Sequence, residues 1–278
     1  MNDQALQDEN RDPARERILL VTGASSAIGR ALVRQVAPGF DTVFAHYNRG
    51  KDAVDALRDE IARTAHSAKN ETGTNTPHII PVQADFADED ATRACIDSIL
   101  KTGKTPTHIV HLSAERASWK KFAKFTWEDY RHEIDISLRT AVLIAQAFVP
   151  AMARAKYGRF VFVLTAYLCG ADPKYMSPYI TSKYALLGLM KNLAAEYREK
   201  NVFFNAVSPE MTDTPFVENV PEPARRMAAE QSPEKRLLSP EDIVPPIAYL
   251  LSDDAQTVTG ENIYVGSAGE WKKVNDAV

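Results

Sequence analysis

Short apolar runs alternate with amphipathic stretches along most of this chain. The runs predict β-strands at residues 17–21, 42–46, 78–83, 108–112, 160–164, 201–207 and 262–265. Between them, helical spacing of apolar residues occurs at 28–36, 52–65, 88–100, 127–155, in a stretch ending near residue 200, and at 240–251. The strands are continuous apolar runs, which is typical of a parallel sheet covered by helices on both faces. The pattern predicts one doubly wound α/β domain, a Rossmann fold.

Three segments fall outside this alternation. Residues 1–16 are polar and are expected to form a disordered or loosely attached tail, which leaves residues 17–278 as the domain. Residues 66–77 are rich in Ser, Asn, Thr and Gly and predict a surface loop. Residues 211–235 combine prolines with scattered charge, and we expect them to form a lid over the substrate.

Composition narrows the class of protein. The chain has 278 residues, 45% of them hydrophobic and 25% charged, which is ordinary for one large globular domain. A net charge of −4 argues against nucleic acid as a partner. No apolar run approaches the length of a membrane span, and the N-terminus lacks the apolar core of a secretory signal. We therefore expect a cytoplasmic protein with no nucleic-acid or membrane partner.

The sequence gives little support for a metal site, a disulfide or a hydrolase. Cys95 and Cys169 are expected to be reduced and unpaired. The six histidines are scattered, and no Gly-x-Ser-x-Gly elbow occurs. The sequence predicts neither a metal site nor a nucleophilic hydrolase.

A glycine-containing turn stands between the first predicted strand and the first predicted helix, with the sequence Thr22-Gly23-Ala24-Ser25-Ser26-Ala27-Ile28-Gly29. Its first glycine permits a tight turn, and its last permits close packing of helix on strand. The free N–H groups at the start of the helix offer a site for a pyrophosphate. The alternative is a plain strand–turn–helix connection.

Tyr179 and Lys183 are the strongest catalytic candidates. Four residues apart on a predicted helix, their side chains share one face. An ammonium beside a phenol lowers the phenol's pKa from about 10, so that it can exchange a proton with a substrate hydroxyl or carbonyl. By itself, the pair could be two exposed residues on a helix. The glycine turn upstream makes the catalytic interpretation the favoured one.

Together these motifs resemble the short-chain dehydrogenase/reductase family, and the layout is most similar to 3-oxoacyl carrier-protein reductases. The resemblance runs from residue 17 to about residue 269 and includes Ser208-Pro209, Thr214-Pro215, the run at 236–243, and Thr259-Gly260. It implies hydride transfer between a nicotinamide and a carbonyl or secondary alcohol. It also implies a small-molecule or carrier-bound substrate, and a homodimer or homotetramer formed through the helices at 127–155 and 177–200.

The resemblance also implies catalytic roles. Tyr179 would be the general acid or base, and Lys183 would tune it and bind the nicotinamide ribose. Thr165 falls where the family has a serine, one residue further from the tyrosine; functional and structural interpretations of it are equally open. Ser137 falls at the position of an asparagine that supports a proton-relay water, and an ordinary packed serine is the favoured interpretation.

The cofactor is expected to be NADP, with NAD possible. The second strand is followed by Asn48-Arg49 rather than by an acidic residue, and Arg49 could pair with a 2′-phosphate or simply be solvated. The residues expected to bind the cofactor are Thr22, Gly23, Ser25, Ser26, Ala27, Ile28, Gly29, Asn48, Arg49, Asp85, Phe86, Ser113, Ala114, Tyr179, Lys183, Pro209 and Thr214.

Several departures from the family pattern keep a second hypothesis open. Ala27 replaces the middle glycine of the turn, which is tolerable if its φ is negative. Glu210 replaces the glycine after Pro209 and is expected to face solvent. Gly-Ser-Ala-Gly at 266–269 replaces the usual Asp-Gly-Gly. With Ser137 and the displaced Thr165, these changes allow a catalytically weak or inactive dinucleotide-binding protein with a regulatory or scaffold role.

Overall fold

A seven-stranded parallel sheet forms the centre of the computed structural model, which describes residues 15–72, 76–116, 118–169 and 174–266. The strand order is β3-β2-β1-β4-β5-β6-β7, so the predicted doubly wound Rossmann fold is confirmed. The strands are β1 (Ile18–Thr22), β2 (Thr42–Tyr47), β3 (His78–Gln83), β4 (His108–His111), β5 (Gly158–Val163), β6 (Val202–Pro209) and β7 (Asn262–Val265). Most of the expected tail (1–14) and positions 267–269 lie outside the described residues.

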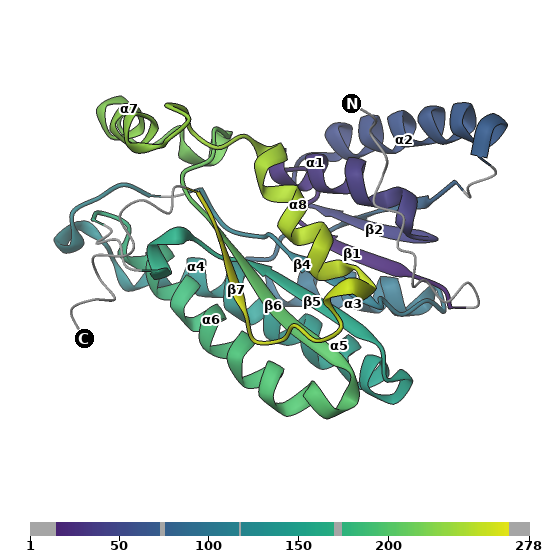
Figure 1. Ribbon diagram of the computed structural model, residues 1–278. Helices are drawn as coiled ribbons and strands as arrows, with labels where there is room; N and C mark the ends of the chain where they lie inside the picture. Colours follow the sequence, from purple (N-terminus) through teal and green to yellow (C-terminus); the bar gives the residue numbers. More distant parts are fainter. Residues whose placement is uncertain (1–14, 73–75, 117, 170–173, 267–278) are drawn as a thin grey trace.

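Helices cover both faces of the sheet (Figure 1). Helices α1 (Ala27–Val36), α2 (Lys51–Thr72) and α8 (Pro240–Leu251) pack on one face. Helices α3 (Glu89–Lys101), α5 (Thr140–Ala155) and α6 (Ser177–Tyr197) pack on the other. Each face has its own hydrophobic cluster, which is why the strands are apolar on both sides.

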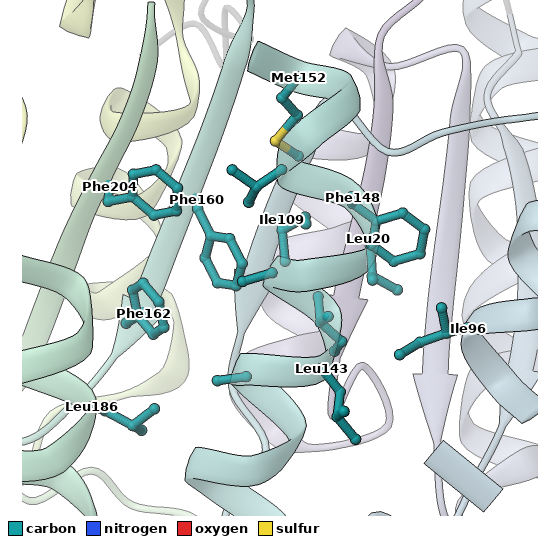
Figure 2. Packing of buried hydrophobic residues seen from close by; sticks show 14 of the residues in the cluster. Leu20, Ile96, Ile109, Leu143, Phe148, Met152, Phe160, Phe162, Leu186 and Phe204 are labelled. Carbon is teal, nitrogen blue, oxygen red and sulfur yellow. The ribbon is translucent and has the colours of Figure 1, made fainter. Parts of the chain in front are cut away.

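The larger cluster lies between α5 and the central strands (Figure 2). Phe148 of α5 is fully buried there, and the rings of Phe160 and Phe162 on β5 stack at 4.5 Å between centroids. Burying each such ring contributes roughly 2 kcal/mol. This packing fixes β5, whose carboxyl end leads directly to Thr165.

Two sequence expectations need correction. The predicted loop at 66–77 is wrong over its first half, because α2 continues to Thr72. The helix predicted at 127–155 is interrupted: α4 (Trp127–Ile134) is followed by a π-helical turn, Asp135–Arg139, before α5 begins. Single π turns inside helices are frequently found at functional sites.

By length and composition, the stretch Trp127–Ala155 would also pass as a membrane span. Half of its most apolar window is buried inside the fold, as expected for a core helix of a globular domain. Its apolar character is therefore explained by packing against the sheet.

The sheet reverses its strand order between β1 and β4. In this kind of sheet, ligands bind outside the carboxyl ends of the strands at that reversal. The parallel register pairs Thr22 at the end of β1 with His111 at the end of β4. The lid expected at 211–235 follows β6 and contains helix α7 (Glu222–Gln231), which stands off beyond the same end of the sheet (Figure 1).

Candidate active site

A cavity of about 480 Å³ opens at the carboxyl ends of the strands. Most of the residues selected from the sequence line it: Gly23, Ser25, Ser26, Ala27, Ile28, Asn48, Arg49, Asp85, Phe86, Ser113, Ala114, Thr165, Tyr179, Lys183, Pro209 and Thr214. Thr22, Gly29 and Ser137 are buried behind this lining. They do not line the cavity themselves but help to position residues that do.

The glycine turn is built by close backbone contacts. A Cβ on Gly29 would lie 2.3 Å from the carbonyl oxygen of Gly23, so only glycine fits where helix meets strand. Gly23 has φ +70°, which an L-residue rarely adopts. Ser26 caps helix α1 by accepting a hydrogen bond from the Gly29 N–H at 3.0 Å. Ala27 is the first residue of α1 and is not among the residues with positive φ, so its methyl causes no backbone strain.

His46 supports this turn, a role that the sequence did not reveal. The Gly23 N–H donates to His46 Nδ1 at 3.0 Å, so Nε2 carries the proton and donates to the Ala84 carbonyl at 3.1 Å. The ring stacks on Phe86 with centroids 3.8 Å apart. Burial lowers the pKa of His46 to about 4, so the ring stays neutral and keeps this tautomer.

A second buried histidine joins β1, β4 and the π turn. Thr22 Oγ1 accepts from the Leu112 and Ser113 N–H groups and donates to His111 Nδ1 at 3.1 Å. His111 Nε2 then donates to the Ser137 carbonyl at 2.9 Å. Burial, with the nearby Lys183 charge, lowers the pKa of His111 to about 3. A neutral histidine thus orients both the strand end and the π turn.

The end of the cavity near β2 carries two arginines. Arg49 lies in the loop after β2 and Arg30 on α1, and within the described ranges neither forms an ion pair. Gly50 lets this loop approach the glycine turn, because a Cβ there would lie 2.6 Å from Ser25 Cβ. Asp85 also lines the cavity, and its carboxylate accepts from the Ala87 N–H at 3.0 Å. The sequence identified Arg49 but not Arg30.

Thr165 and Tyr179 meet at the opposite end. The Thr165 side chain is close enough to the Tyr179 hydroxyl to affect its pKa, both residues line the cavity, and both are largely buried. The extra residue between them, compared with the family spacing, therefore does not separate them. The chain after Thr165 coils into a 3₁₀ turn, Ala166–Cys169, so separation in sequence is a poor guide to distance here.

Lys183 lies behind the tyrosine ring. Its Nζ is 5.6 Å from the Tyr179 ring centroid and donates to the Val163 carbonyl at 2.8 Å. Burial lowers the pKa of Lys183 to about 8, and Glu133 opposes this. Burial also raises the pKa of Tyr179, although its interaction with Thr165 works in the other direction. The expected lowering of the tyrosine pKa is therefore wrong for this arrangement, because desolvation of the phenolate outweighs the opposing interaction with Thr165.

Glu210 does not simply face solvent, contrary to expectation. Its carboxylate is hydrogen-bonded to the Tyr264 hydroxyl while the residue lines the cavity. A Cβ on Gly266 would lie 2.4 Å from Glu210 Cδ, so the replacement of the usual carboxylate by glycine at 266 makes room for the one at 210. The two departures from the family pattern are thus coupled.

The aromatic residues ahead of α4 have different environments. Trp119 packs beside Tyr179 and Met176. Phe122 and Trp127 are 75% and 72% exposed, so a core position for Trp127 is ruled out. Among the side chains that the structure describes, no three His, Cys, Asp or Glu residues gather as metal ligands would, and both cysteines are free.

A family model described as enoyl-(acyl carrier protein) reductase matches residues 23–267. The 3-oxoacyl-[acyl-carrier-protein] reductase of Thermotoga maritima is 28% identical over 248 residues, covering 89% of this chain and 95% of that protein. The chain belongs to the short-chain dehydrogenase/reductase family. It is an NAD(P)-dependent oxidoreductase of that family, in which hydride transfer is general.

Solved structures of other family members have the same fold. A Beutenbergia cavernae protein described as a candidate NAD(P)-dependent gluconate 5-dehydrogenase, with NADP bound at low occupancy, has a TM-score of 0.79 at 26% identity, covering 92% of this chain and 97% of that one. A 3-oxoacyl-[acyl-carrier protein] reductase from Brucella melitensis, with NAD bound, has a TM-score of 0.74 at 23% identity, covering 91% of this chain and 90% of that one.

The cavity of this dehydrogenase/reductase fits a nicotinamide dinucleotide. The start of α1 presents free N–H groups beside the Gly23–Gly29 contact, where an added Cβ would collide with backbone. Two arginines lie at one end, and Tyr179 with Lys183 at the other. A dinucleotide spanning the switch point would have its pyrophosphate at the helix and its reactive ring near the tyrosine.

Glu133 is a residue of this site that sequence reasoning missed. It lies on α4, is 6% exposed, and accepts from Ser137 Oγ at 3.2 Å and from Ser182 Oγ at 3.4 Å. Burial raises its pKa, and the charge of Lys183 opposes that change. In the sequence it is one of several acidic residues in a charged stretch. The only available signal was its spacing of four from Ser137.

Proposed function

We propose that this protein is an NADP-dependent oxidoreductase that transfers a hydride between the nicotinamide and a carbonyl or secondary alcohol, with Tyr179 as the proton donor and acceptor. The observation that carries this proposal is the placement of Thr165, Tyr179 and Lys183 together in the wall of one cavity, with Thr165 close enough to affect the pKa of Tyr179. A hydroxyl pair of this kind can hold a substrate oxygen while a hydride is added to the adjacent carbon.

Each residue has a distinct role in this reaction. The bound nicotinamide supplies or accepts the hydride. Because burial raises its pKa, Tyr179 carries its proton at neutral pH and can deliver it to the oxygen of a carbonyl substrate. The Thr165 hydroxyl holds the same oxygen and orients the phenol. Lys183, fixed by the Val163 carbonyl, provides positive charge that stabilises the phenolate left after transfer.

The preference for NADP is supported by charge at the adenosine end. Arg30 and Arg49 line the cavity, and Asn48 rather than an acidic residue follows β2. A guanidinium can bind a 2′-phosphate through two hydrogen bonds, whereas an acidic residue would repel it. Asn48, Asp85 and Phe86 would contact the adenosine, with Phe86 held in place by its stack on His46.

For the substrate, we propose a small ketone or a carrier-bound 3-oxoacyl group. The names of similar proteins include a 3-oxoacyl-[acyl-carrier-protein] reductase, a substituted succinyl-CoA dehydrogenase subunit, a gluconate 5-dehydrogenase and an acetoin dehydrogenase. On the lid side, Met211, Phe216 and Val220 give the cavity an apolar lining, next to Thr212 and Thr214. An apolar wall of this kind suits an acyl chain better than a sugar acid.

Two of the observations that favoured an inactive dinucleotide-binding protein no longer favour it. Ala27 takes an ordinary helical conformation, and Thr165 reaches Tyr179. Ser137 and Glu210 remain as departures. We therefore rank the enzyme first.

We further propose that the protein works in the cytoplasm as a homodimer or homotetramer, without nucleic-acid or membrane partners. Trp127 on α4 and Tyr184 on α6 are 72% and 52% exposed on the helices expected at the interface. Exposed aromatic side chains on adjacent helices suit such a surface.

The experiment is a cofactor and substrate screen. Fluorescence titration should give a lower Kd for NADPH than for NADH, and R49A should weaken NADPH binding about tenfold while leaving NADH binding unchanged. R63A, on the exposed side of α2, is the matched control. NADPH oxidation is then followed with acetoacetyl-CoA, 5-ketogluconate and diacetyl. Binding of NADPH with no turnover of any of these ketones or the corresponding alcohols would favour the inactive protein. Equal loss of both cofactors in R49A would contradict the NADP assignment.

A further inference from the structure

A buried carboxylate stands where the family's proton-relay asparagine is missing. Ser137 occupies the asparagine position, but it is fully buried and its hydroxyl donates to Glu133. Glu133, one helical turn earlier, also accepts from Ser182, the neighbour of Lys183 in sequence. The polar group at this point of the site is therefore the carboxylate of Glu133, and Ser137 only holds it.

Glu133 also lies on a second cavity. This cavity, of about 220 Å³, is lined by Glu133, Tyr179, Glu115 and His132, among others. His132 and Glu115 approach to 3.4 Å, and their side chains are 45% and 38% exposed. Tyr179 and Glu115 line both cavities. The second cavity thus connects the back of the catalytic tyrosine, through Glu133, with groups that reach solvent.

We propose that Glu133 passes protons between the Tyr179–Lys183 pair and solvent by way of this second cavity, and so replaces the relay asparagine of the family. The inference rests on the proposed function, because the relay has a purpose only if Tyr179 gives up a proton in each turnover. It assigns Glu133 a role in proton transfer, and Ser137 and Ser182 the role of positioning residues.

The proton balance is simple for the reductive direction. Tyr179 gives its proton to the substrate oxygen as the hydride reaches the carbon, which leaves a phenolate. The phenolate is reprotonated at the expense of the Lys183 ammonium. The Glu133 carboxylate takes one proton from solvent through the second cavity and passes it to the Lys183 amine, which restores the ammonium and the carboxylate. One hydride and one proton are consumed in each turnover, and the oxidative direction reverses every step.

The electrostatics around Glu133 favour such an exchange. The charged and titratable groups around it are Lys183 and Tyr179 on α6, Glu115 and Arg116 in the loop after β4, and Glu128, Asp129 and His132 on its own helix. Burial raises the pKa of Glu133 and lowers that of Lys183 to about 8. The two pKa values move towards each other, so moving a proton between the groups costs less than it would in water.

The test compares Glu133→Gln with Glu196→Gln. Glutamine keeps the shape and an oxygen that can accept from one serine, but it cannot take up a proton. With NADPH and acetoacetyl-CoA, or whichever ketone of the screen the wild type reduces, we expect E133Q to lose about 10²-fold in kcat. The NADPH Kd at neutral pH should change less than threefold. E196Q, at an exposed position on α6 that lines neither cavity, should match the wild type.

Two further readouts separate proton transfer from a structural role. Removing the negative charge of Glu133 must lower the pKa of Lys183, so the alkaline midpoint of NADPH binding should shift to lower pH in E133Q, even without turnover. In Glu133→Ala, added formate should restore kcat in a concentration-dependent manner, because a small acid can enter the enlarged cavity. Formate should have no effect on Tyr179→Phe.

The outcomes are distinct. If wild-type protein binds NADPH but turns over no substrate, the proposed function fails and this inference fails with it. If the wild type is active and E133Q retains more than a third of its kcat at every pH, only the relay is overturned. A large loss in E133Q and E133A, with no formate rescue and an unshifted binding midpoint, would also overturn it, since that is the result of a purely structural role.

Discussion

The two ends of the central sheet both bury charged side chains, but in different ways. At the amino ends of the strands, Arg159 is 2% exposed and its Nη2 lies 3.2 Å from Asp253 Oδ1. Its guanidinium also lies 4.6 Å from the ring centroid of Phe203. Next to it, Arg17 donates to the Leu251 carbonyl at 3.2 Å. The charges there are in direct contact with their partners.

At the carboxyl ends, Lys183 and Glu133 influence each other without sharing a hydrogen bond that fixes both. Lys183 donates to a backbone carbonyl, and Glu133 accepts from two serine hydroxyls. Each borders a cavity rather than packed apolar side chains. The pKa of each is therefore shifted by burial towards the neutral form.

The difference indicates what each cluster does. A buried charge in direct contact with its partner is held in one protonation state and contributes to the fold. A buried charge that borders a cavity and is not locked in a direct ion pair has a shifted pKa and can exchange protons. The same fold thus contains a structural charge cluster at one end of its strands and a reactive one at the other.

The largest expected effect comes from removing one hydroxyl at each end. Tyr179→Phe should reduce kcat at least about 10³-fold, because it removes the hydroxyl that donates the proton in the proposed reaction. Tyr157→Phe, which removes a 3.5 Å contact to Asp253, should leave kcat unchanged and cost under about 1 kcal/mol of stability. Steady-state kinetics and urea unfolding of both variants measure this. A comparable loss of kcat in Y157F would end the distinction between the two clusters.

The next effect should appear in stability alone. Arg159→Leu leaves the Asp253 carboxylate without its buried partner, and we expect it to lower the free energy of unfolding by about 3 kcal/mol. Arg131→Leu breaks an exposed ion pair with Glu128 and should cost less than about 0.5 kcal/mol. Chemical denaturation gives both values. The kcat per folded molecule should be unaffected in R159L; a specific loss of activity would mean that the amino end contributes to catalysis.

The smallest expected effect tests whether the Thr165 hydroxyl contributes to catalysis at the carboxyl ends of the strands. Thr165→Val has nearly the same shape but no hydroxyl, and we expect kcat to fall about 100-fold. Thr165→Ser keeps the hydroxyl and should retain most of the activity. The kcat values of the two variants, measured at several pH values, distinguish a catalytic role of the hydroxyl from a packing role. If valine and serine behave alike, Thr165 serves only in packing.

Prediction from sequence was strongest where the signal is local. The turn at 22–29 has a spacing set by backbone geometry, and the strand and helix pattern around it indicated the fold. It failed at residues 66–72, where polar composition concealed the last turns of α2. Polar residues are compatible with both an exposed helix and a loop, so composition alone could not distinguish them.

The catalytic end was less predictable because its contacts join distant segments. Lys183 could be recognised as the neighbour of Tyr179 by helical spacing, but the direction of the tyrosine pKa depends on burial, and it was predicted wrongly. The displacement of Thr165 along the chain suggested a gap that the 3₁₀ turn after it removes. Glu210 was expected in solvent, but Tyr264 on the neighbouring strand binds it.

The sequence by itself determined the doubly wound fold, the cofactor turn and the Tyr179–Lys183 pair, because each depends on residues a few positions apart. Only the tertiary structure decided that Thr165 meets Tyr179, that His46 and His111 hold the strand ends, and that Glu133 faces the catalytic lysine. Those contacts depend on how α4, β5 and α6 pack together. Packing of distant segments sets both distance and burial, and burial sets the pKa values on which the chemistry depends.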